Sequence, residues 1–144
     1  MGNNALGGYV VAQTVIASVT AAVAEVADSV LATVYVPNNA TILDVILTVT
    51  DMDTGGTTLT LDVGDASGPA TPDDDRFIAA FAASAAGSIR ASDSAGLLEG
   101  VYTYRGLKGT DDSQTEQAIE CTIKAAATTG AAGTVTMTVI HTRS

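Results

Sequence analysis

Acidic residues form the pattern in this chain that comes nearest to a known chemical site. Residues 51–62 read DMDTGGTTLTLD, with aspartates at positions 1, 3 and 12 and a glycine at position 6 of a calcium-binding EF-hand loop. Such a loop lies between two helices, whereas the flanking segments alternate between apolar and polar residues as strands do. We therefore interpret the stretch as an acidic turn between strands. Loose calcium binding by Asp51 and Asp53 is the alternative.

A second acidic group, Asp73-Asp74-Asp75, could hold a divalent cation together with Asp62 and Asp65. Carboxylate oxygens are the ligands that such cations prefer. The simpler interpretation is a solvated loop whose acids enter the first turn of a helix, where negative charge favours the helix dipole, and we favour it. Paired carboxylates also hydrolyse glycosidic bonds, but no tryptophan and only 4% aromatic residues disfavour a carbohydrate enzyme or binding module.

His141 and Cys121 are the only histidine and the only cysteine, and neither belongs to a catalytic pattern. No G-x-S-x-G sequence presents a serine to His141, and three-histidine zinc sites and intrachain disulfides are impossible. Cys121 alternates with isoleucines, as a core residue does. No P-loop or dinucleotide fingerprint is present. We expect no catalytic, cofactor-binding or metal-binding residue, and no enzyme.

Charge and composition exclude further classes. The net charge is -10, and the basic residues are scattered, so nucleic acid and anionic membranes are not expected partners. The start of the chain lacks a signal-peptide pattern, and no apolar run reaches the roughly 18 residues of a membrane span, so we expect cytoplasmic synthesis. Much of the 47% hydrophobic content is alanine, which buries little area. A lone subunit should therefore be only modestly stable, and association with neighbours is expected.

The aspartates, His141 and Cys121 lie in or beside segments that alternate between apolar and polar residues as β-strands do. In residues 41–50, Leu43, Val45, Leu47 and Val49 share one face, and a largely hydroxylated face lies opposite. Leu59, Leu61 and Val63 alternate in the same way with Thr58, Thr60 and Asp62. Gly55-Gly56 can supply the positive φ of a reversal. Residues 41–65 are therefore predicted to form a β-hairpin.

The rest of the chain repeats this pattern. Strands are predicted at residues 9–20, 30–36, 88–105, 116–125 and 134–142, with turns or loops at 37–39, 66–75, 108–115 and 128–133. Valines at helical spacing in residues 19–30 compete with a strand reading, and we favour strand, short loop or helix turn, strand.

Residues 76–88 contain good helix formers. They predict one short helix around residues 74–86, although RFIAAF could instead pair as a strand. Residues 1–8 are predicted to be a flexible arm, and residues 9–144 a single domain. The expected fold class is all-β, an antiparallel β-sandwich or jelly roll.

The order of these segments resembles small virion structural proteins of tailed bacteriophages, of the capsid decoration or cement kind. The resemblance is carried by YVV at residues 9–11, the strand at 30–37 with TILDVILTVT after it, TLTLDVGD at 58–65, DDDRFIAAF at 73–81 and the alternating C-terminal strand. It implies a β-sandwich subunit on the capsid surface of a virion, in contact with the major capsid protein. It also implies a homotrimer and no catalytic residue.

A phage tail or fibre component and a non-viral β-sandwich adhesin or ligand-binding module are the alternative functions. For the decoration function, we expect the arm at residues 1–8 to become ordered on a neighbouring subunit and to add specific contacts at some entropic cost.

Overall fold

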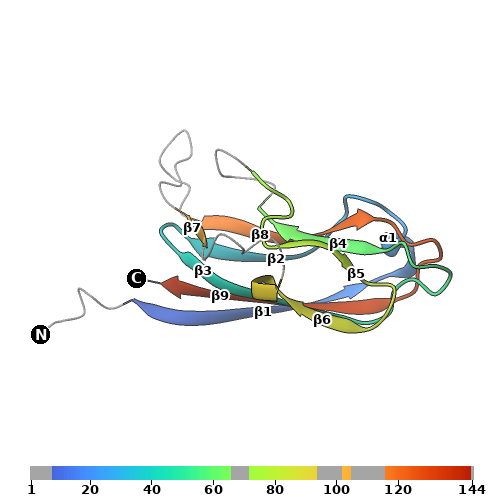
Figure 1. The fold of residues 1–144 in the computed structure, drawn as a ribbon, viewed down its shortest axis with the longest axis horizontal. Helices are drawn as coiled ribbons and strands as arrows, with labels where there is room; N and C mark the ends of the chain where they lie inside the picture. Colours follow the sequence, from blue (N-terminus) through green and yellow to red (C-terminus); the bar gives the residue numbers. More distant parts are fainter. Residues whose placement is uncertain (1–7, 66–71, 94–101, 105–115, 144) are drawn as a thin grey trace, which may run out of the picture.

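Nine strands in two antiparallel sheets make up the protein in the computed structural model, which describes residues 8–65, 72–93, 102–104 and 116–143 (Figure 1). The strands are β1 (Tyr9–Val19), β2 (Val30–Pro37), β3 (Thr41–Val49), β4 (Thr60–Gly64), β5 (Ile78–Ala82), β6 (Gly87–Arg90), β7 (Tyr102–Thr103), β8 (Glu116–Ala125) and β9 (Gly133–Arg143). A helical turn, α1 (Ala21–Ala24), and a 3₁₀ turn, η2 (Ala91–Asp93), are the helical elements among these residues. The prediction of an all-β antiparallel sandwich is confirmed.

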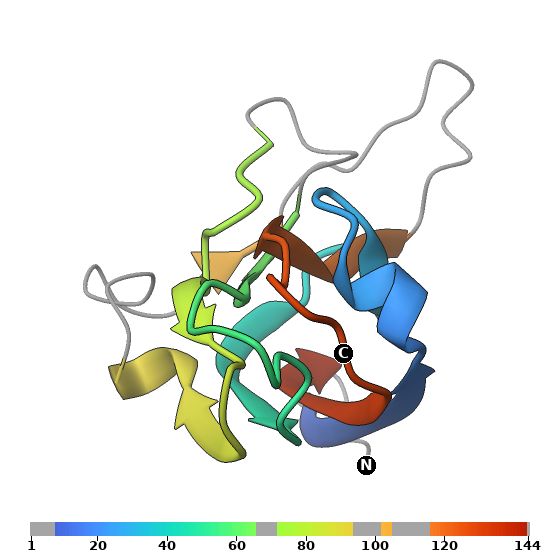
Figure 2. The ribbon, with the colours of Figure 1, turned by 90° about the vertical axis from the view of Figure 1, so that its right-hand side faces the viewer.

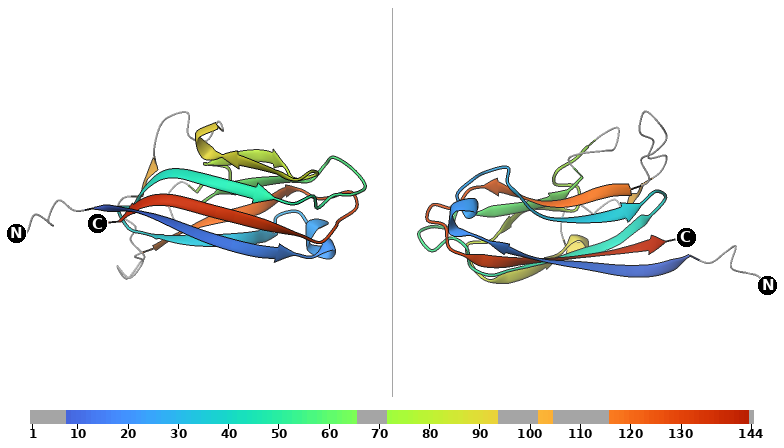
Figure 3. Two further views of the ribbon diagram at one scale, coloured as in Figure 1. Left: turned by 90° about the horizontal axis from the view of Figure 1, so that it is seen from below. Right: turned by 180° about the vertical axis from the view of Figure 1, so that it is seen from behind.

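The two sheets lie face to face, as Figure 1 and the right view of Figure 3 show. One has the order β1-β9-β3-β6, with β7 also paired to β3, and the other has the order β2-β8-β4-β5. Alternate side chains point into the space between them. The predicted apolar faces are confirmed, since their residues are buried: Leu59, Leu61 and Val63; Ile119, Cys121 and Ile123; Val135, Met137 and Val139. Asp62, between Leu61 and Val63, is buried as well.

The predicted hairpin of residues 41–65 is wrong. β3 belongs to the five-stranded sheet and β4 to the four-stranded sheet, so the chain crosses from one layer to the other (Figure 2). The connecting segment is itself buried at Met52 and Leu59, and Asp53 forms a bridge with Gly130 in the loop between β8 and β9. The turn is therefore fixed by that loop, and β3 and β4 find their partners in β9 and β8.

The helix predicted around residues 74–86 is also wrong, and the strand alternative is correct. β5 pairs with β4 from Thr60–Ala82 to Val63–Ile78, with an irregularity between Leu61 and Val63. Phe77 and Ile78 are adjacent in sequence and both fully buried. Burial of these side chains and the backbone bonds to β4 outweigh the helix propensity of the alanines.

Other segments follow the sequence closely. The chain runs from β1 through α1 to β2, as favoured, and Thr20 caps α1 by accepting a hydrogen bond from the N–H of Val23. Asn39 supplies a positive φ of 66° at the turn after β2. In β3 the face of Val45, Leu47 and Val49 is confirmed. An irregularity between Ile42 and Asp44 buries those two residues instead of Leu43.

Several predictions lie outside the described residues. They concern most of the arm at residues 1–8, most of the loop at 66–75, the polar turn at 108–115, and Leu97, Leu98 and Val101. Within the part of the chain that the structure describes, no helix has the length and apolar character needed to cross a membrane.

Candidate functional site

The outer face of the five-stranded sheet is nearly free of charge. Side chains that point away from the core are small, hydroxylated or aliphatic, and two of them are charged. These residues are Val10, Ala12, Thr14, Ile16 and Ser18 on β1; Thr134, Thr136, Thr138, Ile140 and Thr142 on β9; Asp44, Ile46 and Thr48 on β3; and Ser88 and Arg90 on β6. The two charges neutralise each other, since Arg90 donates to Asp44 at 3.0 Å. We call this surface the neutral face.

Hydroxyl groups on the neutral face bond to one another across neighbouring strands. Thr14 on β1 pairs with Thr138 on β9 at 2.9 Å, and Thr48 on β3 pairs with Ser88 on β6 at 3.0 Å. Such pairs satisfy the hydroxyl groups within the sheet and hold the side chains in fixed rotamers. The face is therefore suited to contact with another protein more than to chemistry.

The outer face of the four-stranded sheet is acidic. Carboxylate oxygens of Asp62 on β4 and of Asp74 and Asp75 before β5 all lie within 4.8 Å of one another, and we call these residues the acidic cluster. Asp62 accepts from the backbone N–H of Ala80 at 2.7 Å, and its other oxygen is 3.7 Å from the ammonium group of Lys124.

The close carboxylates of the acidic cluster affect the pKa of Asp75. A side-chain hydrogen bond with Asp73 raises the pKa of Asp75, and burial and the neighbouring negative charges add to this effect. The structure thus brings Asp62 to Asp74 and Asp75, as the cation hypothesis required. Asp65 and the backbone N–H group of Asp73 belong to a second set of contacts.

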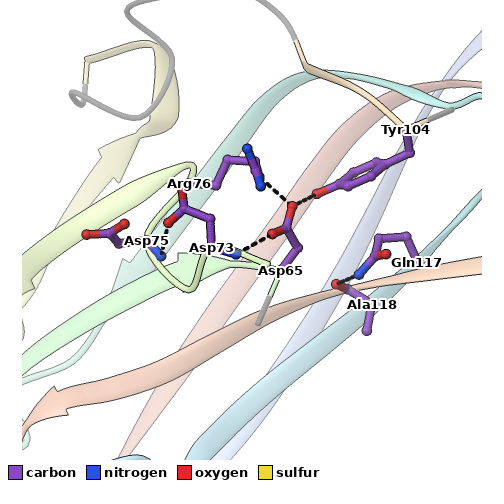
Figure 4. A network of polar contacts seen from close by, with 7 residues as sticks. All are labelled: Asp65, Asp73, Asp75, Arg76, Tyr104, Gln117 and Ala118. Atoms are coloured by element: carbon purple, nitrogen blue, oxygen red, sulfur yellow. Dashed lines mark hydrogen bonds and ion pairs between the residues drawn. The ribbon is translucent and has the colours of Figure 1, made fainter. Parts of the chain in front are cut away.

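That second set is centred on the fully buried Asp65 (Figure 4). One of its oxygens accepts from the hydroxyl of Tyr104 and, at 2.6 Å, from Nε of Arg76, while the other accepts from the N–H of Asp73 at 2.9 Å. The guanidinium of Arg76 also lies 4.1 Å from the ring centroid of Tyr102. Burial raises the pKa of Tyr104, and the hydrogen bond to Asp65 raises it further. These contacts fasten the end of β4 to the segments of Arg76 and Tyr104, which is a structural task.

Asp53 is likewise occupied by structural bonds. Its side chain is buried and accepts from the N–H groups of Thr58 and Leu59, at 3.2 and 3.3 Å, and of Thr129, at 3.1 Å. Both segments that flank this turn are strands, so the EF-hand arrangement of two helices is absent. A calcium ion at Asp53 would have to displace these N–H donors. The interpretation as an acidic turn is the one that the geometry supports.

The lowered pKa of Asp53 predicts how the folding stability of the protein changes at acid pH. Burial alone raises this pKa, but the backbone N–H donors outweigh burial and lower it from 3.8 to about 2. Because the folded value lies below the unfolded one, the contribution of Asp53 is complete above about pH 4 and is lost as the pH falls toward 2. Asp53→Asn is therefore expected to be less stable than wild type at pH 7 and to change less between pH 4 and pH 2. Thermal unfolding midpoints measured from pH 2 to pH 7 check this. Equal slopes for the two proteins would contradict it.

His141 and Cys121 are core residues in different sheets. The ring nitrogens of His141 lie 2.6 Å from the Gln13 side-chain oxygen and 2.9 Å from the Thr142 carbonyl, and the side chain is fully buried. Cys121 is also fully buried, and burial, with a contribution from the charge of Asp62, raises the pKa of its thiol to about 12. A thiol with this pKa is not a nucleophile at neutral pH.

Sequence reasoning missed which residues the fold brings together. The hydroxyl-rich face was visible as threonines at four of the five alternate positions of residues 134–142. The contacts of Asp65 with Tyr104 and of Gln13 with His141 join residues far apart in the chain, and no local sequence pattern predicts them.

Comparisons with known proteins give matches only at the level of structure. No family model and no curated protein matches the chain. A chain of the cyanophage Pam1 capsid asymmetric unit is similar, with a TM-score of 0.66 and 23% identity over 96% of this chain and 88% of that one. A chain of the capsid of Ralstonia phage GP4 has a TM-score of 0.65 and 26% identity over 92% of this chain and 84% of that one.

A third similar chain is in the acidic stable capsid structure of Helicobacter pylori bacteriophage KHP30. Its TM-score is 0.51, with 15% identity over 95% of this chain and 94% of that one. These three chains are phage capsid proteins. The Pam1 and KHP30 chains establish the shared fold, and the GP4 chain adds a higher identity over most of both chains.

Proposed function

We propose that this chain is a structural virion protein that binds the outside of a phage capsid and stabilises its lattice as a decoration, or cement, protein. The observation that carries the proposal is the likeness to the chain of the GP4 capsid, at 26% identity over 92% of this chain. The three similar chains named above come from capsids, which favours a capsid function over the alternatives of a tail, a fibre or an adhesin.

The roles of the acidic and nucleophilic residues support a function without catalysis. Asp53 and Asp65 hold the turn after β3 and the end of β4, and Cys121 and His141 are enclosed in the core. A protein that binds assembled capsid in preference to free subunits stabilises the assembly by mass action, with no chemical step. An acidic outer sheet keeps such a protein soluble at high concentration.

The proposed partners of this chain are those that the sequence resemblance implies. They are the major capsid protein and sister subunits in a homotrimer, on the surface of the virion, with neither nucleic acid nor membrane bound. The arm at residues 1–8 (MGNNALGG) carries no charged side chain and directly precedes β1. We assign it the task of contacting a neighbouring subunit.

Deletion of residues 1–8 is expected to leave a folded protein that no longer binds capsids. Far-ultraviolet circular dichroism checks the fold. Cosedimentation with capsids assembled without the chain, at a range of protein concentrations, measures occupancy. Undiminished occupancy of the truncated protein would rule out this task for the arm. Full-length protein that sediments with purified tails and leaves capsids bare would instead contradict the decoration function.

A further inference from the structure

β1 is a free sheet edge without the features by which proteins usually protect such edges. It pairs with β9 over all of its 11 residues in one unbroken register, and its other edge meets no further strand of the five-stranded sheet (Figure 3). Exposed edges are normally blunted by short length, charge, proline or a bulge. The sequence of β1, YVVAQTVIASV, contains no lysine, arginine, acid, proline or glycine.

The other three described sheet edges are protected. β6 and β7, which both pair with β3 at the far edge of the five-stranded sheet, have 4 and 2 residues, and β5 has 5 residues. β2 has 8 residues, with an irregularity after Val30 and a proline at its end. The long and uncharged edge of β1 is therefore exceptional among the described strands of this molecule.

The elements that carry exposed large hydrophobic residues are neighbours at this side of the sandwich, although Val10 and Ile16 on β1 and Tyr35 on β2 point to opposite outer faces. Every large hydrophobic residue that the structure shows exposed lies on β1, α1, the turn after α1, or β2: Tyr9, Val10, Ile16, Val23, Val26, Val30 and Tyr35. Figure 2 shows these elements together on one side of the molecule, where the edges of the two sheets meet. Ile16 at 72% and Val10 at 62% are the most exposed of them, and both are on β1. A contact through the edge of β1 would cover part of Val10 and Ile16, which nothing within the described chain covers.

The distribution of charge on this chain indicates that a second copy of it fits the edge of β1. Two copies of a chain with net charge -10 repel each other over most of their surfaces, so contact is least unfavourable where charge is absent. The nearest acids along the chain, Glu25 and Asp28, lie beyond the end of β1, and Glu25 accepts a hydrogen bond from the N–H of Gly130. β1 is thus a surface on which a second copy meets little repulsion.

The outward residues of β1 are also complementary to themselves. In an antiparallel pair of two β1 strands centred on Thr14, Ile16 lies opposite Ala12, and Val10 lies opposite Ser18. Each large side chain therefore meets a small one, and the two threonines face each other on the axis. A two-fold contact requires this kind of self-complementarity, because the same surface serves both subunits. The backbone N–H and C=O groups of the two edges would complete each other's hydrogen bonds.

We infer that the edge of β1 is an interface between two copies of this chain, in which the β1 strands pair antiparallel about Thr14 and join their sheets into one. This contact closes with two copies. It is therefore distinct from the contacts of the homotrimer, which is proposed for the virion surface and not for the free protein, and it stands whether or not the chain binds capsids.

The mass of the protein in solution, measured by light scattering on a size-exclusion column over a range of concentrations, tests the inference. Wild type is expected at twice the chain mass of 14.4 kDa. Ile16→Lys replaces the apolar contact with Ala12 of the second copy by a charged side chain, and is expected to weaken the dimer at least about tenfold, so that its mass falls toward that of one chain at the lower concentrations. The matched control is Thr136→Lys, which adds the same charge to the same face opposite Ile16 but on the interior strand β9, and should remain dimeric.

A double variant tests the register. Ala12→Glu combined with Ile16→Lys places opposite charges across the two-fold axis at both ends of the contact, and is expected to restore the dimer. A wild-type mass of one chain, or a mass of two or three chains that Ile16→Lys does not change, would overturn the inference. An Ile16→Lys variant of unchanged mass that no longer binds capsids would assign β1 to the capsid subunit and would also overturn it.

Discussion

Asp65→Ala is expected to lower the free energy of unfolding by about 3–5 kcal/mol, because it leaves the charge of Arg76 and the hydroxyl of Tyr104 without their shared acceptor. Asp65 and Tyr104 are almost completely buried, so water cannot replace the lost bonds without opening the end of the sandwich. Urea unfolding followed by circular dichroism measures the change.

Tyr104→Phe is the matched control for this substitution. It removes one donor and leaves Asp65 bonded to Arg76 and to the N–H of Asp73, so a smaller loss of about 1–2 kcal/mol is expected. A loss from Asp65→Ala no larger than that from Tyr104→Phe would show that Arg76 contributes nothing through Asp65.

Phe77→Ala is expected to cost about 3–5 kcal/mol of unfolding free energy, because the ring is fully buried and its removal leaves a cavity. The ring also makes an edge contact with Tyr102, at 6.3 Å between centroids. Chemical unfolding monitored by tyrosine fluorescence gives the value.

Phe81→Ala provides the comparison within the same segment. Phe81 lies on β5 opposite Leu61 and is only partly buried, so its truncation should cost clearly less than that of Phe77. A short helix would place Phe77 and Phe81 on one face and make the two losses similar. Similar losses would therefore contradict the strand that the structure shows.

Local alternation was sufficient to predict most of the strands and their buried faces. Val45, Leu47 and Val49 on β3 and Ile119, Cys121 and Ile123 on β8 face the core because side chains repeat every two residues. The same pattern says nothing about which strand lies beside which. β3 pairs with β9, and β4 pairs with β8, so the predicted hairpin failed although both of its strands exist.

The wrong helix has a different physical cause. Alanine favours a helix locally, but the sequence around Phe77 and Ile78 must bury two adjacent large side chains, and pairing with β4 achieves this. Adjacent burial breaks the alternation of an ideal strand, which is why the helix was favoured there over the strand alternative.

The candidate surfaces were predictable in part. Threonines at alternate positions of β9 indicated a hydroxylated face, and the aspartates indicated acidic loops. The free edge of β1 depends on its being first in the order of its sheet, and the apolar side of the molecule depends on β1 and β2 lying at neighbouring edges. Both are properties of topology, and one strand's sequence does not contain them.

Heat stability of capsids tests the central claim most directly. Capsids filled with DNA but assembled without this chain are heated with and without added protein, and a dye reports the temperature at which DNA is released. A decoration protein should raise that temperature until its binding sites are saturated, because only the intact lattice binds it. A release temperature that does not change at any protein concentration would contradict the account.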